Sequence, residues 1–340
     1  MRTGRRTLSL LAAALLAVFV LPGVAGASPP SHEVGDPELL TEGLKGGSGS
    51  AVGPDGGLYV TEAEAGRLTR IDPETGDTTV VADCLPKRIA PFPGGAVDVT
   101  FMDGTAYVLV TLVGPHDPVK GTSVAGIYRI DGRDECTVIA DIGTWSVDNP
   151  PDAEIFVKAG VQFALESYRG GFLVTDGHHN RILFVERDGD VRQVVQLDNV
   201  VPTGLDVKGS KVFVAQAGPV PHRPENGRIM TFRGWSPELR EVASGAPLLV
   251  DVERCGHRLF GLAQGRFFPA DQPAGSPAEA DTGELRVADD GDLRLLVSKL
   301  DRPVSLTFIG HTAYVVTLGG DVLTIADVCR GHRDHDNDDD

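Results

Sequence analysis

The sequence of 340 residues has little of what marks the common classes of enzyme. It holds four cysteines, two tryptophans and three methionines. No Cys-x-x-Cys pair, His-Glu-x-x-His helix or Gly-x-Ser-x-Gly elbow occurs, which leaves the usual zinc-protease and serine-hydrolase motifs unsupported. The Gly-rich stretch at 46–53 lacks the strand-loop-helix context of a phosphate-binding loop. We interpret it as the bend into a first inner strand.

Long apolar runs are also scarce. One run, from Leu8 to Leu21, follows Arg2, Arg5 and Arg6 and precedes a small-residue site that ends at Ala27. A membrane span needs about 20 residues, and this run is shorter. We therefore predict a signal peptide at 1–27, a secreted mature chain and no membrane span. The arginine pair leaves twin-arginine export open beside the general route, which the very apolar run favours.

Basic residues are outnumbered, with 31 Lys and Arg against 48 Asp and Glu and a net charge of -17. The predicted cleavage removes three of the basic residues and none of the acidic ones, which makes the charge of the mature chain -20. Such a surface repels phosphate backbones, so we expect no nucleic-acid partner. The charge is otherwise typical of a well-solvated protein, which we expect to be a monomer.

The four cysteines are Cys84, Cys136, Cys255 and Cys329, and their spacing is too wide for a zinc motif. In an exported protein two disulfides are expected. Three pairings are open. Cys255 and Cys329 fall at strand ends on one predicted face, so we favour that pair, which leaves Cys84 with Cys136.

The chain after residue 27 repeats a short pattern. Helical periodicity is nearly absent, and runs of Val, Ile, Leu, Tyr and Phe alternate with Gly-rich turns. Each tight turn is followed by an apolar second strand, a third strand and, in five of six cases, a fourth. The turn glycines, suited to positive φ, are Gly56, Gly104, Gly170, Gly209, Gly256 and Gly310.

The sixth repeat lacks its last strand, and a candidate for it lies at the other end of the chain. Residues 37–52 match 293–308 in pattern. The sequence therefore predicts an all-β, six-bladed β-propeller over 28–330, with the last blade closed by the N-terminal strand of the mature chain. Residues 331–340 predict an acidic disordered tail, whose Asp and His residues could also bind a cation loosely.

Long loops on one predicted face are where binding would concentrate. In a propeller the loops between second and third strands share a face with the links between blades, and the tight turns lie opposite. Long loops on a rigid scaffold commonly bind ligands. Four histidines fall in these loops, so we predict that a divalent cation is bound by His116, His178, His179 and His222.

Polar residues at strand ends and links complete the predicted site. Glu154 and Asp176 are the candidate catalytic carboxylates. The candidate ligand-binding residues are Glu62, Asp98, Thr203, Gln216, Asp251 and Gln264. The alternative is structural, because such residues also hydrogen-bond loop backbone. Neighbouring side chains in extended backbone point apart, so we expect only one of His178 and His179 to face the mouth.

Several stretches together resemble the ScyD/ScyE family. They include GSGSAVGPDGGLYVTE from residue 47, GVQFALESYRGGFLVTDGHHNR at 160–181, AQAGPVPHRPENG at 215–227 and LLVDVE at 248–253. The likeness extends from about Pro37 to Asp327. It implies a secreted or periplasmic six-bladed propeller, named for members encoded with scytonemin pigment assembly, where a metal-dependent oxidative step has been proposed.

The chain is distantly similar to gluconolactonase-type propellers as well. Their calcium site needs a Glu at the start of an inner strand and the Asn of an Asn-Gly pair, where this chain has Ser48, Ser50 and Thr203. The resemblance therefore does not extend to that calcium site. Pyrroloquinoline-quinone sugar dehydrogenases share the PDGGLYVTE style, but their cofactor residues find no match here.

Three functions remain open at this point. The first is a propeller that binds a small molecule on the long-loop face, with or without a divalent cation; the sequence leaves the cofactor otherwise unknown. The second is a metal-dependent oxidoreductase or hydrolase, with Glu154 or Asp176 as base and His178 or His222 as ligand or acid. The third is a protein-interaction scaffold, whose exposed apolar patch would come from Trp145, Phe267 and Phe268.

Overall fold

The fold is described from a computed structural model. It describes Met1 and residues 34–91, 93–152, 157–219, 222–235, 238–267 and 276–330. The predicted signal peptide beyond Met1, the predicted tail and Glu154 lie outside these residues. The chain divides into two units, Met1–Ser31 and His32–Asp340, and the second contains all of the strands.

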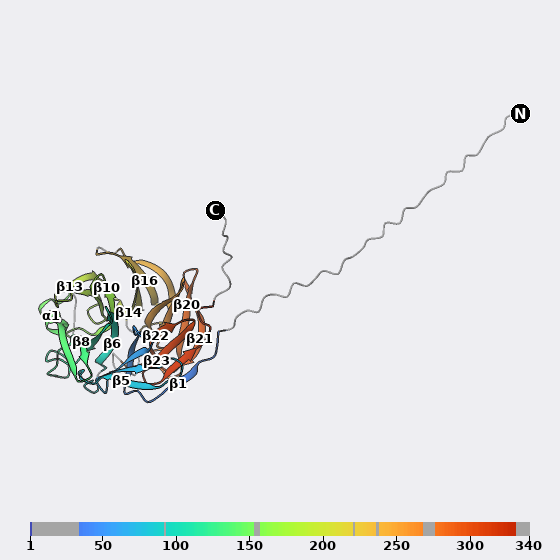
Figure 1. Ribbon diagram of the computed structural model, residues 1–340. Coiled ribbons are helices and arrows are strands. Elements are labelled where there is room, and N and C mark those ends of the chain that lie inside the picture. Colours follow the sequence, from blue (N-terminus) through green and yellow to red (C-terminus); the bar gives the residue numbers. More distant parts are fainter. Residues whose placement is uncertain are drawn as a thin grey trace. The chain divides into compact units, whose positions relative to one another are not determined.

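One end strand of each four-stranded sheet and both end strands of the eight-stranded sheet are the inner strands. Each inner strand contacts two other inner strands, so that the contacts return to the starting strand. Figure 1 shows this arrangement around a common centre. The inner strands are β2 (Gly47–Val52), β6 (Gly95–Met102), β10 (Gln162–Tyr168), β14 (Val201–Lys208), β18 (Leu249–Cys255) and β22 (Pro303–Ile309).

The remaining strands pair antiparallel outward from the inner ones. The second strands are β3 (Leu58–Glu62), β7 (Thr105–Thr111), β11 (Gly171–Asp176), β15 (Lys211–Gly218), β19 (Arg258–Ala263) and β23 (Thr312–Thr317). The third strands are β4 (Arg67–Ile71), β8 (Gly126–Gly132), β12 (Arg181–Val185), β16 (Gly227–Arg233), β20 (Gly283–Asp289) and β24 (Val322–Ile325). The outer strands are β5 (Thr78–Ala82), β9 (Glu135–Asp141), β13 (Val191–Gln196), β17 (Arg240–Ala246), β21 (Asp292–Leu300) and β1 (Glu38–Thr41).

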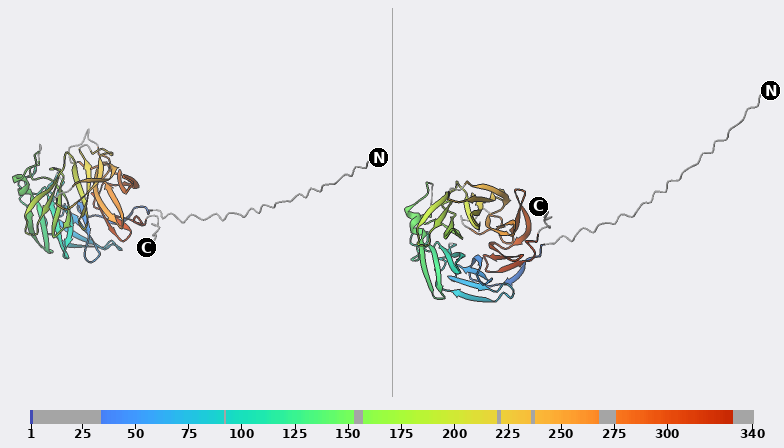
Figure 2. Two further views of the ribbon diagram at one scale, coloured as in Figure 1. Left: turned by 90° about the horizontal axis from the view of Figure 1, so that it is seen from above. Right: turned by 45° about the horizontal axis from the view of Figure 1, so that its top comes forward.

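These strands form four four-stranded sheets and one eight-stranded sheet. In the eight-stranded sheet the outer strands β17 and β21 meet through a single parallel pairing, Ser244 with Asp292. The first strand of the chain, β1, pairs antiparallel with the last, β24. The protein is therefore an all-β propeller, and the two further views in Figure 2 show its sheets arranged about one axis.

Burial explains why the middle strands are nearly continuous in apolar residues. All five residues of β12 are buried, whereas most of β9 is exposed or half-buried. Neighbouring sheets pack face to face, and Leu109 and Ile127 contribute with Phe172 and Leu183 to one such core. Strands covered on both faces lose the polar alternation of half-exposed ones. The outer strands are more exposed because their far side meets water.

The six tight turns are confirmed at the predicted glycines. Gly56, Gly104 and Gly170 have φ of +79°, +80° and +82°, and the other three lie between +60° and +63°. A β-carbon added at any of the six would meet no atom within 4 Å. The left-handed backbone, rather than crowding, is therefore what requires glycine here.

Both predicted disulfides are confirmed. Cys84 pairs with Cys136, with Cα atoms 5.8 Å apart, and Cys255 pairs with Cys329 at 5.7 Å. Both separations fall in the usual range for a disulfide. The first bond joins the segment after β5 to β9, and the second joins the end of β18 to the segment after β24.

One short helix, α1 (Ile142–Asp148), interrupts the pattern between β9 and β10. It was not predicted, because seven residues are too few to display a helical period. The side chain of Asp141 caps it by accepting the Thr144 N–H at 2.9 Å. Nothing helical in the described ranges has the length and apolarity that crossing a membrane requires.

Candidate functional site

A cavity of about 380 Å³ lies among the starts of the inner strands and the long loops. Its wall is mostly apolar. Apolar side chains that line it are Val97, Leu112, Val161, Phe163, Leu248, Phe267, Val304 and Leu318. Pockets of this size and character are typical sites for small molecules. We refer to this space as the axial cavity.

Two aspartates line the axial cavity in equivalent positions. Asp98 on β6 accepts the N–H groups of Val99 at 2.9 Å and of Leu165, on the next inner strand, at 2.7 Å. Asp251 on β18 accepts the N–H groups of Val252 at 2.9 Å and of Leu306, on the next inner strand, at 2.8 Å. Each carboxyl group thus fastens two inner strands together and keeps lone pairs for a further donor.

Glycines make room for these carboxyl groups. A β-carbon at Gly49 would lie 2.1 Å from Oδ1 of Asp98, and one at Gly204 would lie 2.3 Å from Oδ1 of Asp251. In both cases it would also meet backbone within 3.0 Å. Only glycine fits at these two points, so the same local construction occurs twice in the ring.

The two aspartates resist ionisation. Burial raises the pKa of Asp98 well above its usual value, the Leu165 N–H opposes the rise, and the charge of Asp251 adds to it. Burial likewise raises the pKa of Asp251 to about 7, against the hydrogen bonds from Leu306 and Val252. Near neutral pH the Asp251 carboxyl can therefore lose or gain a proton.

More carboxyl groups surround the pair. Burial raises the pKa of Glu166 and Glu253 well above the usual value, and the charges of Asp206 and Asp251 raise both further. Asp206 has a cationic partner, because Arg254 donates to its Oδ1 at 3.0 Å. The described residues give Asp98, Asp251, Glu166 and Glu253 no such ion pair. The inner strands therefore concentrate carboxyl groups with little neutralising charge.

Five predicted site residues line the axial cavity: Asp98, Thr203, His222, Asp251 and Gln264. The Thr203 hydroxyl donates to the Leu249 carbonyl at 2.9 Å. The His222 ring lies edge-on to Phe267 with ring centres 5.5 Å apart, and burial lowers its pKa. The structure thus brings these five together.

Glu62 and Gln216 are placed elsewhere, since neither lines the axial cavity. Glu62 is buried, where its Oε2 accepts the Lys45 N–H at 2.7 Å and its Oε1 accepts the Thr69 hydroxyl at 2.5 Å. Gln216 is 4% exposed at the end of β15. Glu62 has the structural role that the sequence left open, that of satisfying loop backbone.

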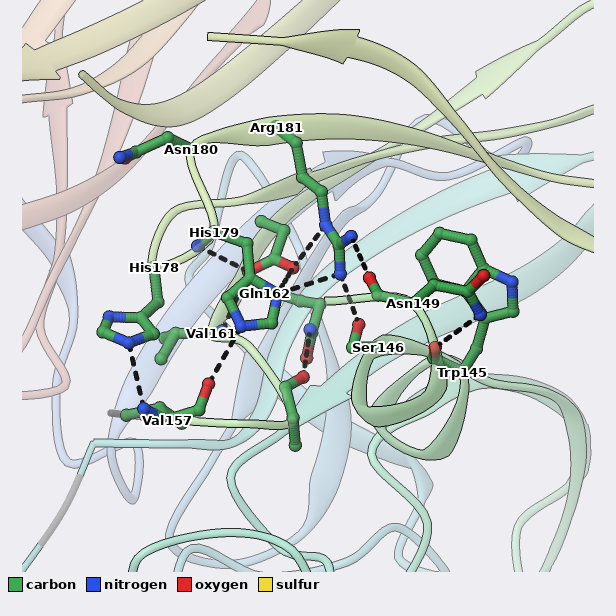
Figure 3. A network of polar contacts seen from close by, with 12 residues as sticks. Trp145, Ser146, Asn149, Val157, Val161, Gln162, His178, His179, Asn180 and Arg181 are labelled. Carbon is green, nitrogen blue, oxygen red and sulfur yellow. Dashed lines mark hydrogen bonds and ion pairs between the residues drawn. The ribbon is translucent and has the colours of Figure 1, made fainter. Parts of the chain in front are cut away.

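Asp176 lies in a buried network of polar contacts with His179 and Arg181, two residues that Figure 3 labels. Its Oδ2 accepts from Arg181 Nε at 3.1 Å and lies 3.0 Å from His179 Nδ1. Burial would raise the pKa of Asp176, but the hydrogen bond from His179 and the charge of Arg181 outweigh it and hold that pKa below its usual value. Arg181 in turn donates to the Asn149 carbonyl and the Ser146 hydroxyl at 2.8 and 2.9 Å.

The rings of His178 and His179 both contact the backbone of Val157, in the segment before β10. The Val157 N–H donates to His178 Nε2 at 3.0 Å, and His179 Nε2 lies 3.0 Å from the Val157 carbonyl oxygen. Figure 3 shows both rings turned toward Val157. Neither ring lines the axial cavity. Their visible role is to hold the chain that leads into β10.

His116 lines a separate cavity of about 150 Å³, together with Asp117, Asp141, Thr122 and Ser123. Four predicted metal ligands are thus distributed over three places. Among the described residues, the only three His, Cys, Asp or Glu ligand atoms that gather closely enough for one ion belong to Cys255, His311 and Cys329. Both of those sulfurs are in a disulfide, so they offer no thiolate.

The aromatic residues considered for a protein-binding patch are partly covered. Trp145 is half-buried under the Arg181 guanidinium, which lies 5.0 Å from its ring centre. Phe267 is half-buried against His222 and lines the axial cavity. Phe268 lies outside the described residues.

Sequence reasoning named both aspartates but missed their equivalence. The tripeptide Val-Asp-Val occurs at 97–99 and again at 250–252, and this repetition was the available signal. It also missed Gly49 and Gly204, because the atoms that crowd them belong to the neighbouring inner strand.

Comparison with solved structures supports the fold. A gluconolactonase from Xanthomonas campestris aligns at a TM-score of 0.57 and 14% identity, over 89% of this chain and 99% of that one. The pyrroloquinoline-quinone-bound aldose sugar dehydrogenase of Streptomyces coelicolor aligns at 0.55 and 13%, over 88% and 99%. Virginiamycin B lyase of Staphylococcus aureus aligns at 0.51 and 12%, over 86% and 98%. At such identities the likeness establishes a β-propeller of this structural type and nothing about activity.

No protein-family model matches the chain, and no curated protein does. The lactonase-like calcium site also lacks its ligands here. Ser48 and Thr203 line the axial cavity, but their side chains carry neither a carboxylate nor an amide group. The Ser50 hydroxyl hydrogen-bonds to the hydroxyl groups of Ser305 and Thr307 at 2.8 Å each.

Proposed function

We propose that this protein binds a small molecule in the axial cavity, with an apolar body against the wall and a positively charged group beside Asp98 and Asp251. One observation carries the proposal. The cavity combines an apolar wall with two carboxyl groups that are held rigidly by backbone N–H groups and have no cationic partner among the described residues.

Charge selects the class of ligand. Arg88 also lines the cavity, but its guanidinium is paired with the Glu64 carboxylate. An anionic ligand would meet Asp98, Asp251 and the neighbouring carboxyl groups, which repel it. A protonated amine with an aromatic or aliphatic body would pair with the aspartates and bury its apolar surface at the same time.

The raised pKa values add a proton-linked signature. At pH 6 the Asp251 carboxyl, with a pKa of about 7, is mostly protonated in the free protein. A bound cation favours the ionised form, so binding should release protons. Above pH 8 that carboxyl is already ionised, and the release due to it should disappear.

The test uses three probes of one shape: 2-phenylethylamine, 2-phenylethanol and phenylacetate. Isothermal titration calorimetry should give the tightest binding for the amine, weaker binding for the alcohol and none for the acid. Titrations in two buffers of different ionisation enthalpy count the released protons. Asp98→Asn with Asp251→Asn should remove the preference for the amine, and Asp134→Asn, an exposed residue of the β8–β9 turn, is the matched control. Equal affinity for amine and acid would contradict the proposal.

Catalysis is the second candidate. The Asp251 carboxyl, with a pKa of about 7, is suited to general acid–base chemistry at neutral pH. Among the proteins of similar fold are a gluconolactonase and a sugar dehydrogenase, so an enzyme is a reasonable alternative. The base in such a reaction would be Asp98 or Asp251 rather than Asp176, whose oxygens are taken by Arg181 and His179. Turnover lost in Asp251→Asn but kept in Asp98→Asn would support this role.

We also infer six blades, with β1 completing the last one, and a secreted mature chain. Counting each half of the eight-stranded sheet as one blade supports the number, and the pairing of β1 with β24 supports the closure. The two disulfides and the apolar run before Ala27 support export. N-terminal sequencing of the exported protein would test the cleavage site.

A further inference from the structure

The small cavity beside His116 contains a carboxylate oxygen with no partner. Asp117 is 2% exposed. Its Oδ2 accepts the Gly114 N–H at 2.6 Å, whereas Oδ1 is buried and forms no hydrogen bond within the described part of the chain. Leaving a buried carboxylate oxygen unpaired is costly, so a native structure normally supplies a partner.

The basic groups nearby do not supply it. The ammonium group of Lys120 donates to the Pro115 carbonyl at 2.8 Å, and its side chain is exposed. His116 is exposed as well. No ion pair joins Asp117 to a described basic residue. Burial raises the pKa of Asp117 against the Gly114 N–H and the charges of His116 and Lys120, which compensate its charge only in part. The hydrogen-bonding capacity of Oδ1 is left unused within the described residues.

The cavity is large enough for a partner from solution. Its volume of about 150 Å³ exceeds the share of one water molecule, which is about 30 Å³. Oxygen-bearing side chains of Thr122, Ser123 and Asp141 line it together with Asp117. The Asp141 carboxylate is occupied by Thr144, to whose N–H and hydroxyl it bonds at 2.9 and 2.8 Å.

The geometry points to a site for a hard divalent cation of the calcium class, bound through Oδ1 of Asp117 at the base of the loop between β7 and β8. A water molecule would donate a hydrogen bond to Oδ1 but would not neutralise the carboxylate. A bound cation would coordinate Oδ1 and neutralise the carboxylate at the same time. Oxygen ligands around one carboxylate suit calcium. This site is separate from the axial cavity and does not depend on the function proposed there.

Affinity should be modest. No three carboxylate or imidazole ligand atoms of the described residues converge in this cavity, so water must complete the coordination. We expect a dissociation constant of about 10⁻⁴–10⁻³ M, as in weakly liganded extracellular sites. At 10 mM calcium the melting temperature should rise by about 2–4 °C.

The experiment compares the full-length protein with Asp117→Asn. This substitution keeps the shape and an oxygen for the Gly114 N–H but removes the charge. Melting is followed in EDTA and in 10 mM CaCl₂, with NaCl matching the ionic strength. The wild-type protein and the control Asp134→Asn should gain stability with calcium, and Asp117→Asn should not. An equal gain in all three proteins would place the cation elsewhere and overturn the inference.

A second measurement reports on the loop itself and needs no variant. Lys120 is exposed in the loop that Asp117 anchors, so trypsin can cleave after it. Bound calcium should order the loop and slow this cleavage several-fold in the wild-type protein, as followed by mass spectrometry. Unchanged cleavage together with unchanged melting would show that water alone fills the cavity, and would overturn the site.

Discussion

Two aspartates inside this propeller, the buried Asp176 and the half-buried Asp251, differ in their charge state. Asp176 has Arg181 and His179 against its carboxylate, and the pKa of Asp176 is held below its usual value although it is buried. Asp251 accepts hydrogen bonds from two backbone N–H groups and from the Ser305 side chain but has no ion-pair partner among the described residues, and burial raises its pKa to about 7. Burial alone thus does not decide the charge of a carboxyl group; the presence of a cation does. The first arrangement is a completed structural unit, and the second is open to a partner.

The largest expected effect comes from breaking the completed unit. Arg181→Met would leave the Asp176 carboxylate buried with its main cationic partner gone. We expect a loss of about 3–5 kcal/mol in the free energy of unfolding, measured with urea. Arg187→Ala, which breaks the exposed pair with Asp103, should change the free energy of unfolding far less, because solvent screens that pair. Similar losses in the two variants would show that the network does not stabilise the fold as described.

Removing either histidine that contacts Val157 should lower the free energy of unfolding by less than Arg181→Met does. His179→Ala removes a ring that is 2% exposed and bonds the Val157 carbonyl, and we expect a loss of about 2–3 kcal/mol. His178→Ala removes a half-buried ring and should cost about 1 kcal/mol. Amine binding in the axial cavity should stay within twofold of the wild type in both. A tenfold loss of binding would instead make these rings part of the ligand site.

Asp98 and Asp251 should change how the free energy of unfolding depends on pH. Because the pKa values of Asp98 and Asp251 are raised in the native state, that state binds more protons than the unfolded chain between about pH 4 and pH 7. Their contribution to stability is therefore full below the unfolded pKa and is lost as pH rises, by up to about 1.4 kcal/mol per pH unit for each group.

Urea unfolding at several pH values checks this expectation. The variant Asp98→Asn with Asp251→Asn should show a flatter profile than the wild type over that range. His178 and His222, whose pKa values burial lowers, act in the other direction and are common to both proteins, so the difference isolates the aspartates. Parallel profiles would contradict the raised pKa values.

The smallest effect separates two kinds of glycine. Gly56→Ala adds only backbone strain, because open space surrounds the new methyl group, and should cost about 1 kcal/mol without changing amine binding. Gly204→Ala drives a methyl group against the Asp251 carboxyl and should weaken amine binding tenfold or more. Calorimetry on both variants measures this contrast. Equal binding would mean that the position of the carboxyl group does not matter.

Local signals explain what the sequence predicted correctly. Positive-φ glycines and apolar strand runs act within a few residues, and the turns at Gly56 and Gly310 followed from them. The disulfides join residues 52 and 74 positions apart, and they followed from the predicted repeat, which puts Cys255 and Cys329 at strand ends on one face. Asp98, Asp251 and His222 were named because they fall at strand starts and in long loops, and all three line the axial cavity.

The charge states could not be predicted in the same way. They depend on which side chains turn toward the carboxyl group. Arg181, across the turn between β11 and β12, turns toward Asp176, whereas no cationic side chain pairs with Asp251 in the described structure. The contacts of His178 and His179 with the Val157 backbone could not be predicted from the sequence either. A His-His pair looks the same in a sequence whether its rings bind an ion or a peptide group.

The pairing of β1 with β24 has a consequence for how the protein is made. Residues 38 and 324 become partners only after almost the whole chain is available. Contacts between such distant residues form slowly. A chain that ends before β24 leaves β1 without a partner and the edge of β23 open, and open edges promote aggregation. The pairing therefore requires the chain from β1 to β24, and truncated chains should expose unpaired strand edges.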